Sequence, residues 1–119
     1  MSLTLYGIPN CDTVKKARVW LDANGIAYLF HDFRKDGLDA QTVQSWIAKL
    51  GWEPLVNRKG TTWRKLPEER RALVSDEASA TALMLDASSV IKRPVLVAGD
   101  QTVVGFSADM YSKLFEGKS

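Results

Sequence analysis

Residues 3–21, LTLYGIPNCDTVKKARVWL, contain the segment that decides the fold: an apolar run, a loop and the start of a helix. Leu3 to Tyr6 is typical of a short buried strand. The loop GIPN follows, and from Asp12 apolar residues recur at helical spacing until Asn24-Gly25. Ala27 to Phe33 is rich in aromatic residues and is predicted to form a second strand. A strand, a helix and a strand in about 30 residues form a βαβ unit, so the two strands should be parallel.

The middle of the chain is predicted to be helical. Asp39 can cap an amphipathic helix that ends at Gly51. Residues 54–74 lack a long apolar period and contain two prolines, so we expect short helical pieces and loops there. Ser75, followed by two acidic residues, should start another helix that runs to about Ser88.

Two short runs rich in β-branched residues come near the end of the chain, at residues 94–97 and 102–104. Gly99-Asp100 lies between them and favours a tight hairpin turn. Ser107 can cap a final helix. This order of elements predicts an α/β, thioredoxin-like fold. We expect a four-stranded mixed sheet with a helical insertion, at about residues 38–90, between a βαβ half and a ββα half.

Length and composition restrict the class of protein. A chain of 119 residues predicts one domain, residues 1–119, and 45% hydrophobic with 25% charged residues is typical of a soluble globular protein. With 16 basic and 14 acidic residues the net charge is +2, which argues against direct binding of nucleic acid. There is no signal-peptide pattern, and no apolar run approaches the ~20 residues of a membrane span. We therefore expect a monomeric cytoplasmic protein without membrane contact.

Cys11 is the only cysteine, so an intramolecular disulfide is excluded, and with a single histidine in the chain we expect no metal site. Considered by itself, a lone cysteine is more often a small buried apolar residue. The position of Cys11 favours a different role, because it lies between the GIPN loop and the first helical turn. Backbone N–H groups there have no intrahelical partners and can bind a thiolate. Cys11 is therefore the candidate nucleophile.

The start of a helix alone does not strongly activate a thiol. It is worth ~0.3–1 kcal/mol to a charge, whereas one pKa unit corresponds to ~1.4 kcal/mol. A nearby cation is also required, and Arg93, before Pro94, is a better candidate than Lys15 on the same helix. Val14 occupies the position of the second cysteine of a CxxC motif. Any redox cycle therefore needs an external thiol, for which we expect glutathione.

Three segments together resemble a known family: GIPNCDTVKKA at residues 7–17, NRKGTTWRKLP at 57–67 and IKRPVLV at 91–97. Their order and spacing are similar to those of the arsenate reductase-like (ArsC/Spx) family, and most of all to its YffB-type subgroup. The family includes glutathione-linked arsenate reductases and the Spx transcription regulators. The resemblance extends over nearly the whole chain and implies a thioredoxin-like fold.

The resemblance implies roles for single residues. Cys11 matches the family nucleophile, Arg93 matches the arginine that holds the oxyanion or thiolate, and Pro94 matches a cis-proline, although propensity alone favours an ordinary proline at a strand start. Arg58 matches an arginine of the helical insert that faces the same pocket. Two departures weaken the case for arsenate. Gly7 stands where glutathione-linked arsenate reductases have a histidine, and the last hairpin lacks their third arginine.

Further candidate substrate-binding residues are Asn10 and Thr13, which flank Cys11, and Arg64 within the second motif, which we expect to lie near the cysteine. His31 lies far from the cysteine loop in the sequence, and we expect it to have no catalytic role. The four tryptophans are expected to serve packing rather than substrate binding; they are Trp20, Trp46, Trp52 and Trp63.

Three functions follow as hypotheses. The first is a glutathione-dependent thiol/disulfide reductase acting through Cys11, with glutathione as the reducing co-substrate and glutaredoxin as a possible further partner. The second is an arsenate reductase that uses glutathione and glutaredoxin. The third is a non-catalytic regulator of the Spx kind that binds RNA polymerase. Val14 disfavours this third function, because Spx-type regulators usually sense redox through a CxxC motif.

Overall fold

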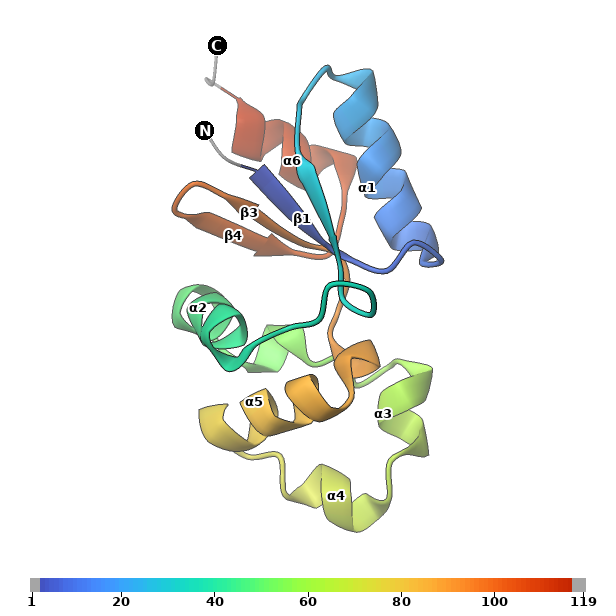
Figure 1. The fold of residues 1–119 in the computed structure, drawn as a ribbon, viewed down its shortest axis with the longest axis vertical. Helices are drawn as coiled ribbons and strands as arrows, with labels where there is room; N and C mark the ends of the chain where they lie inside the picture. Colours follow the sequence, from blue (N-terminus) through green and yellow to red (C-terminus); the bar gives the residue numbers. More distant parts are fainter. Residues whose placement is uncertain (1–2, 117–119) are drawn as a thin grey trace. The chain divides into compact units, whose positions relative to one another are not determined.

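The computed structural model describes residues 3–116, and its backbone contacts divide the chain into two compact units (Figure 1). The first unit consists of Met1–Asp32 and Arg93–Ser119, and the second of Phe33–Lys92. The expectation of one domain with a helical insert at about residues 38–90 stays a prediction.

The first unit contains a four-stranded mixed sheet with the predicted connectivity. Strands β1 and β2 pair in parallel, while β1 with β3 and β3 with β4 pair antiparallel, in the order β2-β1-β3-β4. This arrangement confirms the α/β, thioredoxin-like fold of a βαβ half joined to a ββα half. The elements are β1 (Leu3–Gly7), α1 (Asp12–Ala23), β2 (Leu29–Asp32), β3 (Val95–Ala98), β4 (Gln101–Val104) and α6 (Ala108–Phe115).

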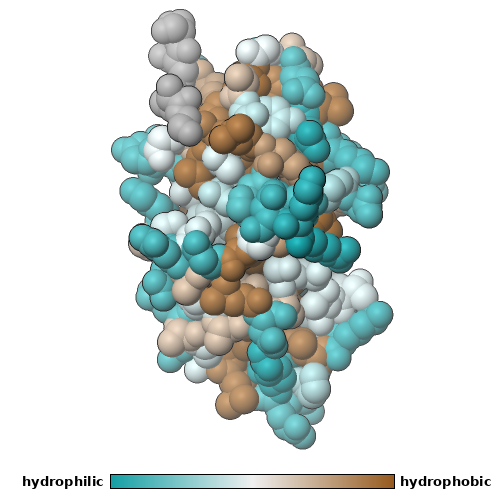
Figure 2. Space-filling view, in the orientation of Figure 1, coloured by the Kyte–Doolittle hydropathy of each residue, from teal (hydrophilic) through white to brown (hydrophobic). Residues whose placement is uncertain are grey.

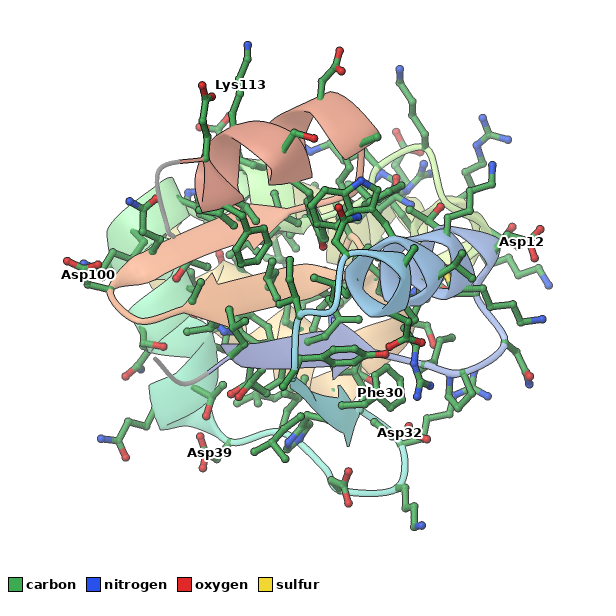
Figure 3. The ribbon with its side chains drawn as sticks, turned by 90° about the horizontal axis from the view of Figure 1, so that it is seen from above. Asp12, Phe30, Asp32, Asp39, Asp100 and Lys113 are labelled. Atoms are coloured by element: carbon green, nitrogen blue, oxygen red, sulfur yellow. The ribbon has the colours of Figure 1, made fainter. Side chains whose placement is uncertain are left out.

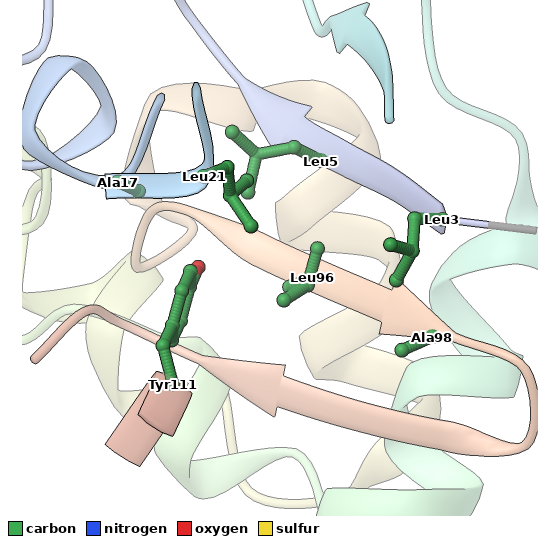
Figure 4. Packing of buried hydrophobic residues seen from close by; sticks show 7 residues of the cluster. All are labelled: Leu3, Leu5, Ala17, Leu21, Leu96, Ala98 and Tyr111. Atoms are coloured by element: carbon green, nitrogen blue, oxygen red, sulfur yellow. The ribbon is translucent and has the colours of Figure 1, made fainter. Parts of the chain in front are cut away.

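Helices α1 and α6 pack against one face of this sheet (Figure 4). The strands contribute alternate residues to the cluster because successive side chains of a strand point to opposite faces. Trp20, on α1, makes an edge-to-face contact with Tyr111 on α6, with ring centroids 5.6 Å apart. The buried members of the cluster are Leu3, Leu5, Ala17, Leu21, Leu96, Ala98 and Tyr111.

Short-range interactions define the ends of several elements as expected. The hydroxyl of Ser107 accepts a hydrogen bond from the backbone N–H of Met110 at 3.0 Å and so caps α6. Gly99 has φ +63°, a conformation that favours glycine, in the turn between β3 and β4. Figure 3 shows Asp100 at the tip of that hairpin.

The second unit is helical. Asp39 caps its first helix by accepting a hydrogen bond from the N–H of Thr42 at 2.8 Å, and Gly51, at φ +80°, ends that helix as predicted. Residues 54–74 form short helices and loops, also as predicted. The elements are α2 (Ala40–Leu50), the 3-10 turn η1 (Glu53–Leu55), α3 (Thr61–Lys65), α4 (Glu68–Ala72), α5 (Glu77–Asp86) and the 3-10 turn η2 (Ser88–Val90).

Two predicted boundaries were wrong. Helix α5 is capped by Asp76 rather than Ser75, because the Asp76 carboxylate accepts the N–H of Ser79 at 2.8 Å while the Ser79 hydroxyl accepts the N–H of Asp76 at 3.1 Å. The second strand covers Leu29–Asp32 instead of residues 27–33, and these four residues pair with Thr4–Gly7 of β1.

The visible face in Figure 2 is mostly covered by hydrophilic side chains, with smaller hydrophobic patches between them. Exposed large apolar residues on the described part of the chain include Val19, Leu29 and Leu73. No helix within residues 3–116 has both the length and the apolar character needed to cross a membrane.

Candidate functional site

Cys11 is the N-cap residue of α1, with an extended backbone at φ −96° and ψ 124°. Its carbonyl accepts the first helical hydrogen bond, from the N–H of Lys15 at 2.9 Å. The residue is partly exposed, and its thiol is not paired in a disulfide. This placement agrees with the helix start that the sequence predicts, and Figure 3 shows Asp12 at that end of α1.

Opposing effects determine the pKa of the Cys11 thiol. Partial burial raises the pKa. The net pKa is nevertheless below its ordinary value, because the thiolate is stabilised by the backbone N–H of Val14, by the hydrogen bond and charge of Arg93, and by the N–H of Thr13. The backbone donors belong to the first turn of α1, where N–H groups have no intrahelical acceptor. The arrangement therefore favours a nucleophilic thiolate.

Arg93 reaches Cys11 because of the way the sheet is paired. Strands β1 and β3 are antiparallel with Tyr6 opposite Val95, so the start of β3 lies beside the end of β1. Arg93 and the buried Pro94 precede β3, and the peptide bond between them is cis, as the family resemblance implied. The carbonyl of Pro94 accepts the N–H of Gly105 at 2.8 Å, which ties this segment to the end of β4. Cys11, Arg93 and Pro94 are thus brought to one edge of the sheet.

Gly7 and Val14 pack together beneath the cysteine loop. A Cβ atom at Gly7 would lie 2.8 Å from Cγ2 of Val14, a separation too short for two carbon atoms. Val14 is fully buried. The contact with Val14 therefore leaves no room for a larger side chain at position 7, which the sequence alone did not reveal.

The remaining predicted residues divide between the two units. Asn10 is exposed on the loop before Cys11, and Thr13 is partly buried, with a backbone N–H that helps to lower the pKa of the Cys11 thiol. Arg58 and Arg64, both exposed, belong to the second unit, and the pocket that they were expected to share with Cys11 stays a prediction. The ring of His31 lies 4.8 Å from that of Tyr6, and its expected lack of a catalytic role also stays a prediction.

Arg58 lies over two indole rings of the second unit. Its guanidinium carbon is 5.5 Å from the ring centroid of Trp52 and 6.0 Å from that of Trp63. Both tryptophans were expected to serve packing, and no signal in the sequence indicated their contacts with Arg58. Trp46, in contrast, is 1% exposed and belongs to the core.

The described residues contain no group of three or more His, Cys, Asp or Glu side chains that could hold a metal ion. The chemistry of the site comes from the thiol of Cys11 and the cation of Arg93 beside it. A thiolate of this kind can attack a sulfur or another electrophilic centre and form a covalent intermediate.

Comparison with known proteins identifies the family. The model of the ArsC family matches residues 6–114. The chain belongs to the ArsC family. The solved structure of a protein named YffB is 50% identical to this ArsC-family chain, with a TM-score of 0.90 over 94% of this chain and 97% of that one. These findings confirm the resemblance deduced from the three motifs.

Two curated proteins are also similar to this member of the ArsC family. An uncharacterized protein of Haemophilus influenzae is 38% identical over 113 residues, which are 95% of this chain and 98% of that protein. The global transcriptional regulator Spx of Streptococcus agalactiae is 25% identical over 112 residues, 90% of this chain and 78% of that protein. The ArsC-like scaffold therefore occurs in a regulator as well.

Proposed function

We propose that this ArsC-family protein is a glutathione-dependent thiol/disulfide reductase that acts through Cys11. The observation that carries the proposal is the partly exposed thiol at the start of α1, whose pKa is lowered by Arg93 and by two backbone N–H groups. Membership of the ArsC family supports thiol-based reduction. The absence of a second cysteine from the sequence requires that the resolving thiol comes from outside the chain.

The proposed cycle begins with the Cys11 thiolate attacking one sulfur of a substrate disulfide. An S–S bond forms between Cys11 and that sulfur, the substrate S–S bond breaks, and the leaving thiolate takes a proton from solvent. The thiolate of glutathione then attacks the substrate sulfur of the mixed disulfide, which releases the Cys11 thiolate and leaves glutathione joined to the substrate. A second glutathione, directly or through glutaredoxin, completes the two-electron reduction and yields oxidised glutathione.

Mass spectrometry of the purified protein after incubation with oxidised glutathione tests the first step. We expect one glutathione per chain, attached at Cys11 and absent from Cys11→Ser. A coupled assay with NADPH, glutathione, glutathione reductase and glutaredoxin then tests turnover with a small mixed disulfide. If no adduct forms and no turnover occurs, the proposal is refuted and the Spx-like regulator remains. A pull-down with RNA polymerase would test that alternative.

Arsenate reduction is the second candidate function, because the family model that matches is that of ArsC. The last hairpin has no basic side chain between Pro94 and Ser107, so a multiply charged oxyanion has few donors there. In the same coupled assay we expect arsenate turnover to be weak or absent. Cys11-dependent turnover of arsenate that exceeds turnover of the mixed disulfide would reverse the order of the two functions.

A further inference from the structure

A hollow of about 380 Å³ lies on the first unit, between the second half of α1, the loop that follows it and β2. Small-molecule sites usually occupy ~300–1,000 Å³, so a ligand of the size of an amino acid can enter this hollow. All its lining residues belong to the first unit, and they are Arg18, Asp22, Ile26, Ala27, Tyr28 and Phe30. We call it the Arg18–Asp22 hollow, after the two charged side chains that line it.

Two aromatic residues at the edge of the sheet hold the Arg18 side chain. Phe30 pairs with Leu5, so its ring lies on the face of the sheet that α1 covers. The guanidinium carbon of Arg18 is 4.3 Å from the ring centroid of Phe30 and 6.0 Å from that of Tyr28. Nε of Arg18 donates to the Tyr28 hydroxyl at 3.0 Å. These contacts orient the guanidinium and use one of its N–H groups, while the N–H groups of the two Nη atoms make no hydrogen bond or ion pair within the described chain.

Asp22 lies one turn after Arg18 on the same side of α1. A spacing of four residues allows an ion pair, but among residues 3–116 these two side chains form none, because the guanidinium is turned towards Tyr28 and Phe30. Asp22 also stands in the last turn of α1, which has no basic residue and where the helix carbonyls disfavour a negative charge. Helix stability therefore does not explain this exposed carboxylate at the hollow.

The loop after α1 is fixed by hydrogen bonds to the end of the helix. The N–H of Gly25 donates to the carbonyl of Asp22 at 3.1 Å, and the N–H of Ile26 donates to the carbonyl of Leu21 at 3.0 Å. Gly25 has φ +66°, a conformation that favours glycine and turns the chain from α1 towards β2. Ile26 and Ala27 then form an apolar border of the hollow. The hollow thus combines an oriented cation, an anion and an apolar border.

Two opposite charges that do not pair with each other favour a ligand that carries both charges. The fork of a guanidinium fits the two oxygens of a carboxylate, and a carboxylate accepts hydrogen bonds from an ammonium. We propose that the Arg18–Asp22 hollow binds the α-ammonium and α-carboxylate groups of an amino acid, with the carboxylate on Arg18 and the ammonium on Asp22. A free amino acid carries these groups, and so does the γ-glutamyl end of glutathione. The inference goes beyond the proposed reductase function and does not depend on it.

NMR titration of the full chain with L-leucine tests the site. The Nε–H signal of Arg18 and the backbone N–H signals of Ile26 and Ala27 report on the hollow, and we expect them to shift and saturate. N-acetyl-leucine lacks the ammonium and leucinamide lacks the carboxylate. Each should bind about 3- to 10-fold more weakly than leucine, the loss of one charge-assisted hydrogen-bonded pair. A parallel titration with S-methylglutathione, which cannot form a disulfide, compares the two sources of the ligand.

Two substitutions test the two charges separately. Asp22→Asn keeps the size of an exposed side chain, so it should weaken leucine binding about 3- to 10-fold and leave the binding of N-acetyl-leucine unchanged. Arg18→Met keeps an apolar stem over Phe30, so it should weaken leucine binding but leave leucinamide unchanged. Lys16→Met on α1 and Asp109→Asn on α6 change exposed charges outside the hollow. These matched controls should bind every probe as the wild type does.

The possible outcomes separate clearly. If neither L-leucine nor S-methylglutathione shifts the signals of the hollow, the proposal is overturned. Equal affinity for leucine, N-acetyl-leucine and leucinamide would also overturn it, and so would an equal loss of all three probes in Asp22→Asn. Tighter binding of leucine than of S-methylglutathione supports the proposal and assigns a free amino acid as the ligand. Tighter binding of S-methylglutathione at the same signals supports it and assigns the γ-glutamyl group.

Discussion

The guanidinium of Arg93 donates a hydrogen bond to the sulfur of Cys11 and is the only charged group that lowers the thiol pKa among the described residues. Arg93 stands before β3, whereas Cys11 follows β1, so the pair exists only because these strands are neighbours. Replacement of Arg93 should therefore change the chemistry of Cys11 more than replacement of any lysine on α1.

We predict that Arg93→Ala raises the pKa of Cys11 more than Lys15→Ala does. At an effective dielectric of ~20, a cation about 4 Å from a thiolate is worth up to about 4 kcal/mol before solvent screening. Lys15 is exposed, and its charge is screened by water and salt. Thiolate absorbance as a function of pH measures both variants. Equal shifts in the two proteins would mean that Arg93 does not act on the sulfur.

The second prediction concerns pH. The Cys11 pKa lies below its ordinary value, so the rate of alkylation by iodoacetamide should reach half its plateau below the ~8.5 of a model thiol. For a depressed acid pKa, the stabilisation is fully present above the unfolded-state pKa and is lost as pH falls through the folded-state pKa. The difference in unfolding free energy between wild type and Cys11→Ser should therefore shrink as pH falls.

Urea unfolding of the two proteins from about pH 5 to pH 9 measures that difference. The denatured protein, or a peptide of the cysteine loop, provides the reference for alkylation. An alkylation midpoint equal to that of the reference, with a stability difference independent of pH, would contradict an activated thiolate at Cys11.

The third prediction concerns Gly7, whose missing Cβ makes room for Val14. Gly7→Ala should lower the free energy of unfolding by about 1–3 kcal/mol, the usual cost of overpacking a core. Val14→Ala should also destabilise, because it leaves a cavity. In the double variant the methyl group added at position 7 faces a smaller side chain at position 14. The double variant should therefore lose less unfolding free energy than the sum of the losses in the two single variants. Strictly additive losses in a double-mutant cycle would show that the two residues are not coupled.

The fourth prediction concerns the hydroxyl of Tyr111. The side chain is fully buried, and its oxygen has no hydrogen-bond partner within the described residues. Burial also raises the pKa of this phenol far above its ordinary value. Because an unsatisfied buried polar group is costly, Tyr111→Phe should raise the free energy of unfolding by about 1 kcal/mol while keeping the ring contacts.

Tyr28→Phe is the matched control for that change. The hydroxyl of Tyr28 accepts a hydrogen bond from Nε of Arg18 at 3.0 Å, and the guanidinium of Arg18 also lies 4.3 Å from the centroid of Phe30, which is labelled in Figure 3. Loss of that hydroxyl should lower stability by about 0.5–1.5 kcal/mol. Both variants are measured by urea unfolding. A loss of unfolding free energy in Tyr111→Phe, like the loss expected for Tyr28→Phe, would contradict the assignment at Tyr111.

Local interactions explain what the sequence alone could predict. Asp39 and Ser107 cap helices by bonding to a backbone N–H three residues later, and Gly99 supplies the positive φ of a hairpin turn. These interactions involve neighbours in the chain, so the residue types indicate them directly. The position of Cys11 at the start of α1 was predictable for the same reason. Boundaries such as the cap at Asp76 were less certain because two adjacent residues, Ser75 and Asp76, can both cap a helix.

Only the tertiary structure decided which distant residues meet. Antiparallel pairing of β1 with β3 brings Arg93 to Cys11, and burial of Val14 explains the glycine at position 7. The four tryptophans are chemically identical in the sequence, yet Trp46 lies in the core while Trp52 and Trp63 hold Arg58. Their roles depend on contacts across turns and between helices, and no periodicity or propensity within a short segment encodes such contacts.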